Sequence, residues 1–152
     1  MTPNDYAYLV YYWYGEPHPE RIPEILATFR DCTWAHRPGR DLPMAGALLG
    51  FETLYPDKKE TWRSEFPAVY RFAERATQTD KQSPAWNDYY IAQWFITRDD
   101  KCLDSLLDRV AEGGEVGFET RLSLENWSER CAPFRVNLER AKAARKECMI
   151  IQ

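Results

Sequence analysis

The stretch TPNDYAYLVYYWYGEPHPERIPEILATF, residues 2–29, returns in its capping and apolar positions 81 residues further along the chain. Thr2-Pro3 returns as Ser83-Pro84, and Trp13-Tyr14 returns as Trp94-Phe95. The other pairs keep their chemical type without a gap: Leu9-Val10 with Tyr90-Ile91, Ile22 with Leu103, Ile25-Leu26 with Leu106-Leu107, and Phe29 with Val110. This spacing predicts two copies of one helical hairpin.

The first hairpin has clear start and stop signals. Thr2 and Pro3 occupy the N-cap and the first helical position, where these residue types are favoured. Glycine and proline over residues 15–19 end this helix, and a second helix is expected over residues 19–33. Further helices are expected over residues 42–55, 57–63, 65–78, 84–97, 100–112, 115–130 and 133–148, with Asp41, Ser64 and Asp99 as caps and Gly113-Gly114 as a helix end.

No segment shows a sustained alternation of apolar and polar residues with a period of two, so we expect little or no strand. The predicted fold class is all-α, a short α-solenoid-like array of about 7–8 helices with the hairpin duplicated at an offset of 81. We expect a single domain over residues 1–152. Copy 1 would cover about 2–78, and copy 2 about 83–148.

Composition limits the possible functions. The net charge is −4, which disfavours non-specific nucleic-acid binding, because that binding depends on Lys and Arg. No run approaches the roughly 18 apolar residues of a membrane span, and no signal peptide is evident. None of the four cysteines belongs to a C-x-x-C pair, so we expect a cytoplasmic protein with reduced thiols: Cys32, Cys102, Cys131 and Cys148.

The outline resembles bacterial TPR- or HEAT-like helical-repeat proteins. The resemblance rests on Trp13-Tyr14 and Trp94-Phe95, which precede their leucine-type stripes, and on the junction Phe51…Tyr55-Pro56-Asp57…Trp62. It covers about two-thirds of the chain, without the 34-residue TPR period. The resemblance implies a helical array and a tendency to bind proteins, and it carries over no functional residues.

Four acids at successive four-residue steps form the clearest surface signal: Asp100, Asp104, Asp108 and Glu112, here called the acidic stripe. Like charges four apart destabilise a helix by about 0.2–0.5 kcal/mol per pair. The corresponding positions of the first copy hold Pro19, Pro23, Ala27 and Asp31, so the repeat does not require these acids. A docking surface for a basic partner is one interpretation. The other is a solvated face, partly neutralised by Arg98, Lys101 and Arg109.

Aromatic residues suggest a second possible site. One face of the first helix cannot bury all its aromatic residues, and Tyr12 falls off the main apolar stripe. Burial between hairpins and an exposed interface both explain this surplus. Together with Trp86, Tyr89 and Tyr90, Tyr12 could line a cleft between the two copies.

The C-terminal helix is basic, with Arg135, Arg140, Lys142, Arg145 and Lys146. It lacks the interleaved aromatic residues that single-stranded nucleic acid stacks on, so a solvated terminal helix is favoured. No catalytic motif is present, and the two histidines, His18 and His36, are not at metal-ligand spacing. We therefore expect no catalytic residues, metal or cofactor.

The sequence favours a non-enzymatic protein-binding module, plausibly a stoichiometric inhibitor or immunity-type protein that binds one basic partner through the acidic stripe. The alternative is a small-molecule-binding or enzymatic domain that uses the aromatic cleft. A structural, self-associating protein is the third hypothesis. The oligomeric state is open between monomer and homodimer.

Overall fold

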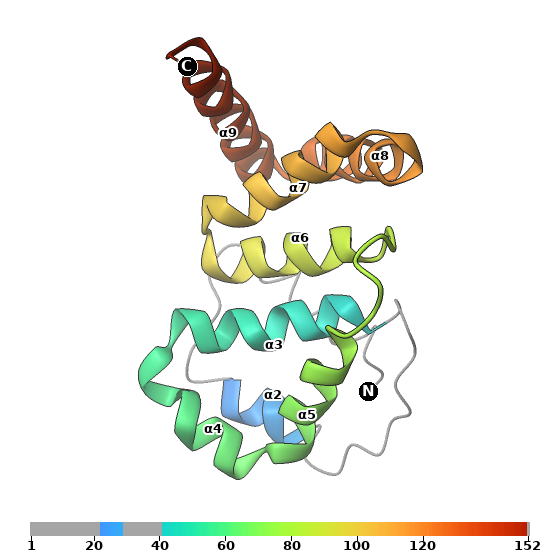
Figure 1. The fold of residues 1–152 in the computed structure, drawn as a ribbon. Helices are drawn as coiled ribbons and strands as arrows, with labels where there is room; N and C mark the ends of the chain where they lie inside the picture. Colours follow the sequence, from blue (N-terminus) through green and yellow to red (C-terminus); the bar gives the residue numbers. More distant parts are fainter. Residues whose placement is uncertain (1–21, 29–40, 152) are drawn as a thin grey trace. The chain divides into compact units, whose positions relative to one another are not determined.

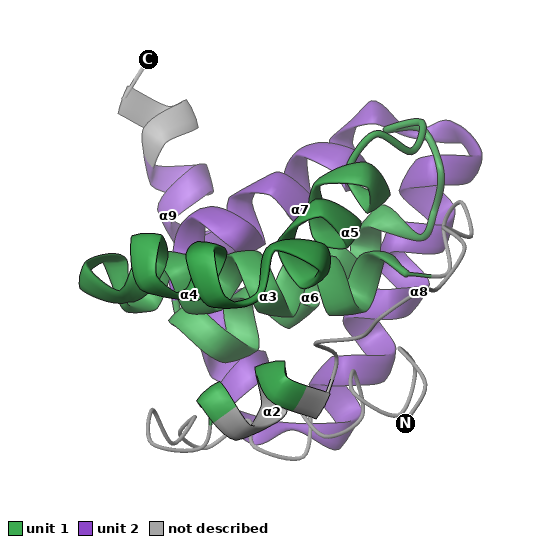
Figure 2. Cartoon of the chain, turned by 90° about the horizontal axis from the view of Figure 1, so that it is seen from below, with its two compact units in different colours: residues 1–98 green, residues 99–152 purple. Residues whose placement is uncertain are grey.

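The computed structural model describes residues 22–28 and 41–151, and within these ranges it contains helices and no strand (Figure 1). The predicted all-α fold is therefore confirmed. The chain groups into two compact units, residues 1–98 and residues 99–152 (Figure 2). Unit 1 contains α2 (Ile22–Thr28), α3 (Leu42–Leu54), the 3-10 turn η2 (Pro56–Lys58), α4 (Lys59–Glu65), α5 (Pro67–Ala76) and α6 (Trp86–Thr97). Unit 2 contains α7 (Asp100–Glu112), α8 (Gly114–Arg130) and α9 (Ala132–Ile151).

The helix ends follow local chemistry. Asp99 caps α7 as predicted, because its carboxylate accepts a hydrogen bond from the backbone nitrogen of Lys101 at 3.0 Å. Gly113 separates α7 from α8 with a φ of 73°, a conformation that glycine adopts without strain. Asp41 occupies the N-cap position of α3, as predicted, and its backbone oxygen accepts a hydrogen bond from the nitrogen of Ala45 at 3.1 Å, although its side chain makes no capping hydrogen bond. One predicted cap was wrong. Ser64 lies inside α4, and α5 instead begins after Phe66, with Pro67 in its first turn.

The described ranges contain only part of the predicted repeat. Ile22 and Leu26 of α2 are buried, and so are their counterparts Leu103 and Leu107 of α7. The first helix of copy 1, with Tyr12 and Trp13, lies outside the described residues. The duplication therefore stays a prediction. The boundary between the compact units, after Arg98, lies beyond the polar segment 79–82 that separates the two predicted copies.

The core of unit 1 forms around α3, which packs along α6 and also contacts α5. Gly46 and Gly50 of α3 lie four residues apart and face α6. A Cβ atom at Gly46 would lie closer than 3.0 Å to the backbone oxygen of Tyr89, so only glycine permits this approach. A Cβ atom at Gly50 would meet the side chain of Ile96 at 3.1 Å. The two glycines therefore set how closely α3 and α6 approach each other.

We predict that Gly46→Ala destabilises the protein. The added methyl group must displace the backbone of α6, and overpacking of this kind costs about 1–3 kcal/mol, more than the gain in helix propensity of about 1 kcal/mol. Gly50→Ala is the matched control, because its closest contact is a side-chain carbon of Ile96 at 3.1 Å and not a backbone oxygen. The free energy of unfolding of this variant should stay within about 1 kcal/mol of the native value. Urea unfolding measures both, and equal stability of the two variants would contradict the prediction.

Candidate functional site

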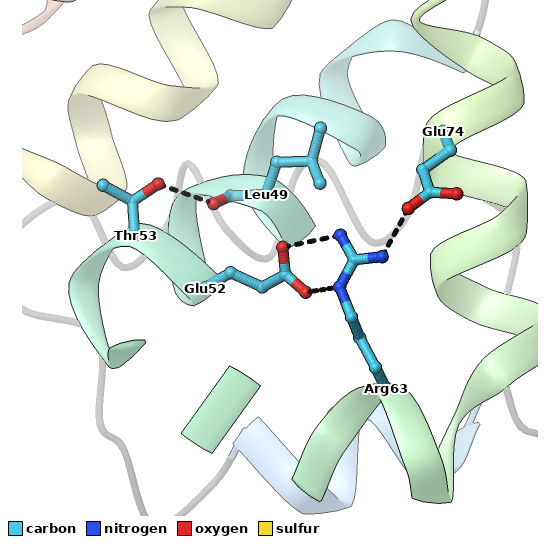
Figure 3. A network of polar contacts seen from close by, with 5 residues as sticks. All are labelled: Leu49, Glu52, Thr53, Arg63 and Glu74. Carbon is cyan, nitrogen blue, oxygen red and sulfur yellow. Dashed lines mark hydrogen bonds and ion pairs between the residues drawn. The ribbon is translucent and has the colours of Figure 1, made fainter. Parts of the chain in front are cut away.

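A charge network around the buried carboxylate of Glu52 in unit 1 is the first candidate site, because buried ionisable groups often mark active sites. Glu52 of α3 is 7% exposed and binds the guanidinium of Arg63 of α4 through two hydrogen bonds (Figure 3). Nε of Arg63 donates to Oε1 of Glu52 at 2.5 Å, and Nη2 donates to Oε2 at 3.0 Å. Nη1 donates to Glu74 of α5. Arg63 thus connects three helices.

The chemistry of this network indicates a structural role. Hydrogen bonds to Glu52 and Glu74 hold the pKa of Arg63 above its ordinary value, so its charge is permanent. Both acids accept hydrogen bonds from the same guanidinium, so Arg63 engages the two carboxylates at once. The network therefore ties α3, α4 and α5 together.

Tyr70 of α5 lies beside this network. The guanidinium carbon of Arg63 is 5.3 Å from the centre of the Tyr70 ring. The Tyr70 hydroxyl is buried and has no hydrogen-bond partner among residues 22–28 and 41–151. Burial raises the pKa of Tyr70, and the negative charge of Glu52 adds to that shift. The phenol is therefore held neutral, and it is unsuited to act as a base near neutral pH.

The acidic stripe in unit 2 is the second candidate. α7 buries Leu103, Leu106 and Leu107, and the four acids lie away from this apolar face, as helical spacing requires. Three members of the stripe are exposed and Asp100 is half-buried. The side chains form one row along the helix, and each step along the row is one turn plus a small rotation.

α9 supplies arginine partners to this row. Nη2 of Arg145 donates to Oδ1 of Asp108 at 2.7 Å, and Nη1 reaches the backbone oxygen of Asp104 at 3.5 Å. Nη2 of Arg140 donates to Oδ2 of Asp100 at 3.3 Å. The acidic stripe and the basic C-terminal helix, which the sequence presents as separate features, therefore contact each other. This contact was not predicted, because no local pattern in the sequence links residues 37 or 40 positions apart.

The remaining acids of the stripe are available. Among the residues that the structure describes, Asp104 and Glu112 make no side-chain ion pair or hydrogen bond, and both are exposed. The two existing pairs are also open to solvent, and exposed pairs contribute about 0.2–1 kcal/mol each. The stripe therefore binds guanidinium groups weakly and keeps two carboxylates for other contacts.

The predicted aromatic cleft is represented by Trp86, Tyr89 and Tyr90 of α6, since Tyr12 lies outside the described residues. Trp86 is 1% exposed, its Nε1 donates to the backbone oxygen of Thr79 at 3.2 Å, and the Lys81 ammonium lies 3.5 Å from its ring centre. Tyr89 and Tyr90 are half-buried, with ring centres 5.3 Å apart. Trp86 is thus a packing anchor, and access for a ligand is limited to the two tyrosines.

The described residues contain neither a metal-binding cluster nor a disulfide. Within residues 22–28 and 41–151, no group of three or more His, Cys, Asp and Glu side chains converges as a metal site would require. His18 and His36 lie outside these ranges. Cys131 is buried and Cys102 is half-buried, and neither forms a disulfide.

Comparisons of the chain with protein-family models, with curated proteins and with solved structures gave no match. In the part of the chain that the structure describes, no helix combines the length and the apolar character needed to cross a bilayer.

One further surface was not predicted. Phe118 and Leu122 of α8 are 54% and 44% exposed, although large apolar side chains usually lie inside. Apolar residues occur all around α8, so the sequence does not reveal which face is buried. The glycine at residue 117 was the available signal, because a glycine within a helix often marks a close contact.

We predict that Arg63→Met destabilises the protein by about 1.5–3 kcal/mol, because it keeps the aliphatic stem but leaves Glu52 buried without its charged partner. Glu74→Gln is the control: this acid is 51% exposed, and its loss should cost less than about 1 kcal/mol. Urea unfolding at neutral pH compares the two. If both variants had the same free energy of unfolding as the native protein, the network would have no structural role.

We also predict that Tyr70 weakens the fold at alkaline pH. Its pKa is higher in the folded chain than in the unfolded chain, so its contribution is complete below the ordinary tyrosine value near pH 10. Above that value the unfolded chain loses the proton first, and stability falls by up to about 1.4 kcal/mol per pH unit. Tyr70→Phe should remove this part of the decrease in the free energy of unfolding with pH. At neutral pH its free energy of unfolding should be unchanged or higher. Urea unfolding from about pH 8 to pH 11 tests this prediction. The same pH dependence of unfolding free energy in the variant and the native protein would contradict it.

Proposed function

We propose that this chain is a non-enzymatic, cytoplasmic protein-binding module that recognises one basic protein partner, in the manner of a stoichiometric inhibitor or immunity-type protein. The observation that carries the proposal is the acidic stripe, in which Asp104 and Glu112 are exposed and have no ion-pair partner among the described residues. They share one row with Asp100 and Asp108, which already bind arginine.

The geometry of the stripe supports this function. Asp100 and Glu112 are twelve positions apart on α7, so the row of four acids extends over about 18 Å, since a helix rises about 1.5 Å per residue. A row of this length matches several basic side chains on a partner. Charge complementarity of this kind speeds association and favours the correct partner more than it raises affinity. α9 provides an internal example, because two of its arginines contact the same row.

The alternative, a small-molecule or enzymatic site in the aromatic cleft, has less support. Trp86 is almost completely buried, and its ring is already covered by Lys81. Tyr89 and Tyr90 contribute only half-buried rings. We therefore place the function on the charged surface of unit 2.

The test compares the native protein with Asp104→Asn/Glu112→Gln as bait in a pull-down from host extract at low and at physiological salt. We expect one stoichiometric partner with the native protein and about tenfold weaker capture with the variant at low salt. The salt dependence should also flatten, because fewer charges act across the interface.

The matched control is Asp57→Asn/Glu60→Gln, which removes the same charge from exposed positions of unit 1 and should leave capture unchanged. Circular dichroism confirms that every bait is folded. Equal capture by the native protein and the stripe variant at low salt would show that the acidic stripe is not part of the interface. A folded monomer that captures no partner would remove the proposed function.

A further inference from the structure

α8 exposes apolar side chains where solvent should favour polar ones. Among the described residues, the exposed large hydrophobic side chains are Phe118, Leu122 and Val136. Phe118 and Leu122 lie one turn apart on α8, so their side chains are neighbours. A single exposed leucine is ordinary, but an aromatic and a leucine side by side form a small apolar patch.

The patch lies opposite the buried side of the helix. α8 buries Gly117, Thr120 and Leu124, and Phe118 and Leu122 fall on the other face at helical spacing. Three exposed glutamates share that face. We call this set the α8 outer face: Glu115, Phe118, Leu122, Glu125 and Glu129.

Gly117 fixes the orientation of α8. A Cβ atom at this position would lie 2.9 Å from the backbone oxygen of Val110, so α8 approaches the end of α7 closely at this point. Thr120, on the same side, is completely buried. Rotating α8 to cover Phe118 would lose this contact and would bring Thr120 into solvent. The exposure of Phe118 is therefore set by the packing of unit 2.

A repeated tetrapeptide shows that the exposure of Phe118 depends on the position of its helix in the fold and not on the local sequence. Gly-Phe-Glu-Thr occurs at residues 50–53 and again at residues 117–120. In both places the glycine makes a close helix contact. Phe51 is completely buried in the core of unit 1, whereas Phe118 is more than half exposed. The same side chain thus forms core in one helix and surface in the other.

The charges of the α8 outer face indicate what covers it. In an antiparallel pair of α8 helices centred on the patch, Glu115 of one copy would lie near Glu125 of the other. In a parallel pair, each glutamate would face its own copy. Both arrangements place glutamates near glutamates, and the exposed Arg121 beside the patch does not offset three acids, so the net charge disfavours self-association. A partner with lysine or arginine around an apolar groove has the complementary pattern.

We propose that the α8 outer face is a docking surface, in which Phe118 and Leu122 insert into an apolar groove bordered by basic residues on a partner protein. This inference rests on the proposed function, since it assigns apolar anchors to the same basic partner. Helix-in-groove recognition commonly uses anchors one turn apart, and buried aromatic anchors contribute most of the binding energy. The glutamates at the edge would set orientation and association rate.

The experiment uses the full chain with a benzophenone amino acid at Arg121, an exposed position beside the patch, irradiated in host cells. The cross-linked protein is identified by mass spectrometry and purified, and its affinity for variants is measured by titration calorimetry. Phe118→Ser and Leu122→Ser should each weaken binding more than tenfold. Val136→Ser removes an equally exposed apolar side chain from α9 and should change affinity less than threefold.

A charge variant tests the edge of the surface. Glu115→Gln/Glu125→Gln should weaken binding at low salt and flatten its salt dependence, while Phe118→Ser should weaken binding at every salt concentration. Cross-linking to a second copy of this chain would overturn the proposal, as would native affinity of Phe118→Ser for the purified partner. If Asp104→Asn/Glu112→Gln loses the partner while Phe118→Ser retains it, the docking surface fails and the proposed function stands. If neither cross-linking nor pull-down yields a partner, both fail.

Discussion

The contact between α3 and α6 at Gly46 is the constraint on which unit 1 depends. Because the backbone oxygen of Tyr89 occupies the space of a side chain at Gly46, the two helices pack closer than ordinary side chains allow. Phe51, on the same helix as Gly46, is completely buried in the core of unit 1. Arg63 then ties α3 to α4 and α5 through two carboxylates, one of them buried. Unit 1 is therefore stabilised both by a close contact between α3 and α6 and by ion pairs that join α3, α4 and α5.

The close glycine contact recurs in unit 2 with a different consequence. Gly117 brings α8 against the backbone of α7, as Gly46 brings α3 against α6. In unit 1 the neighbouring phenylalanine, Phe51, fills the core, but in unit 2 Phe118 is left in solvent. Unit 2 has three helices, and its buried apolar side chains come mainly from α7 and α9. A phenylalanine that the packing of unit 2 does not need is therefore available for another surface.

Local features of the chain were predictable from the sequence, and long-range contacts were not. Asp99, the leucines of α7 and Gly113 mark that helix by capping, periodicity and a glycine stop, and the structure agrees at each point. The ion pair between Asp108 and Arg145 joins positions far apart in the chain, so no local pattern indicates it. α8 carries apolar residues on all sides, and only the contact at Gly117 decides which of them is buried.

The α7–α9 ion pairs and the α8 outer face would impose different requirements on the proposed basic partner. At the acidic stripe, a partner must compete with Arg140 and Arg145, whose local concentration is high because they belong to the same chain. The apolar side chains of α8 meet no such competitor among the described residues, and their burial gives energy that salt does not screen. In the proposed complex, the acidic stripe is therefore suited to attract the partner, and the apolar side chains of α8 are suited to retain it. Charge without the apolar anchors would give fast but short-lived complexes.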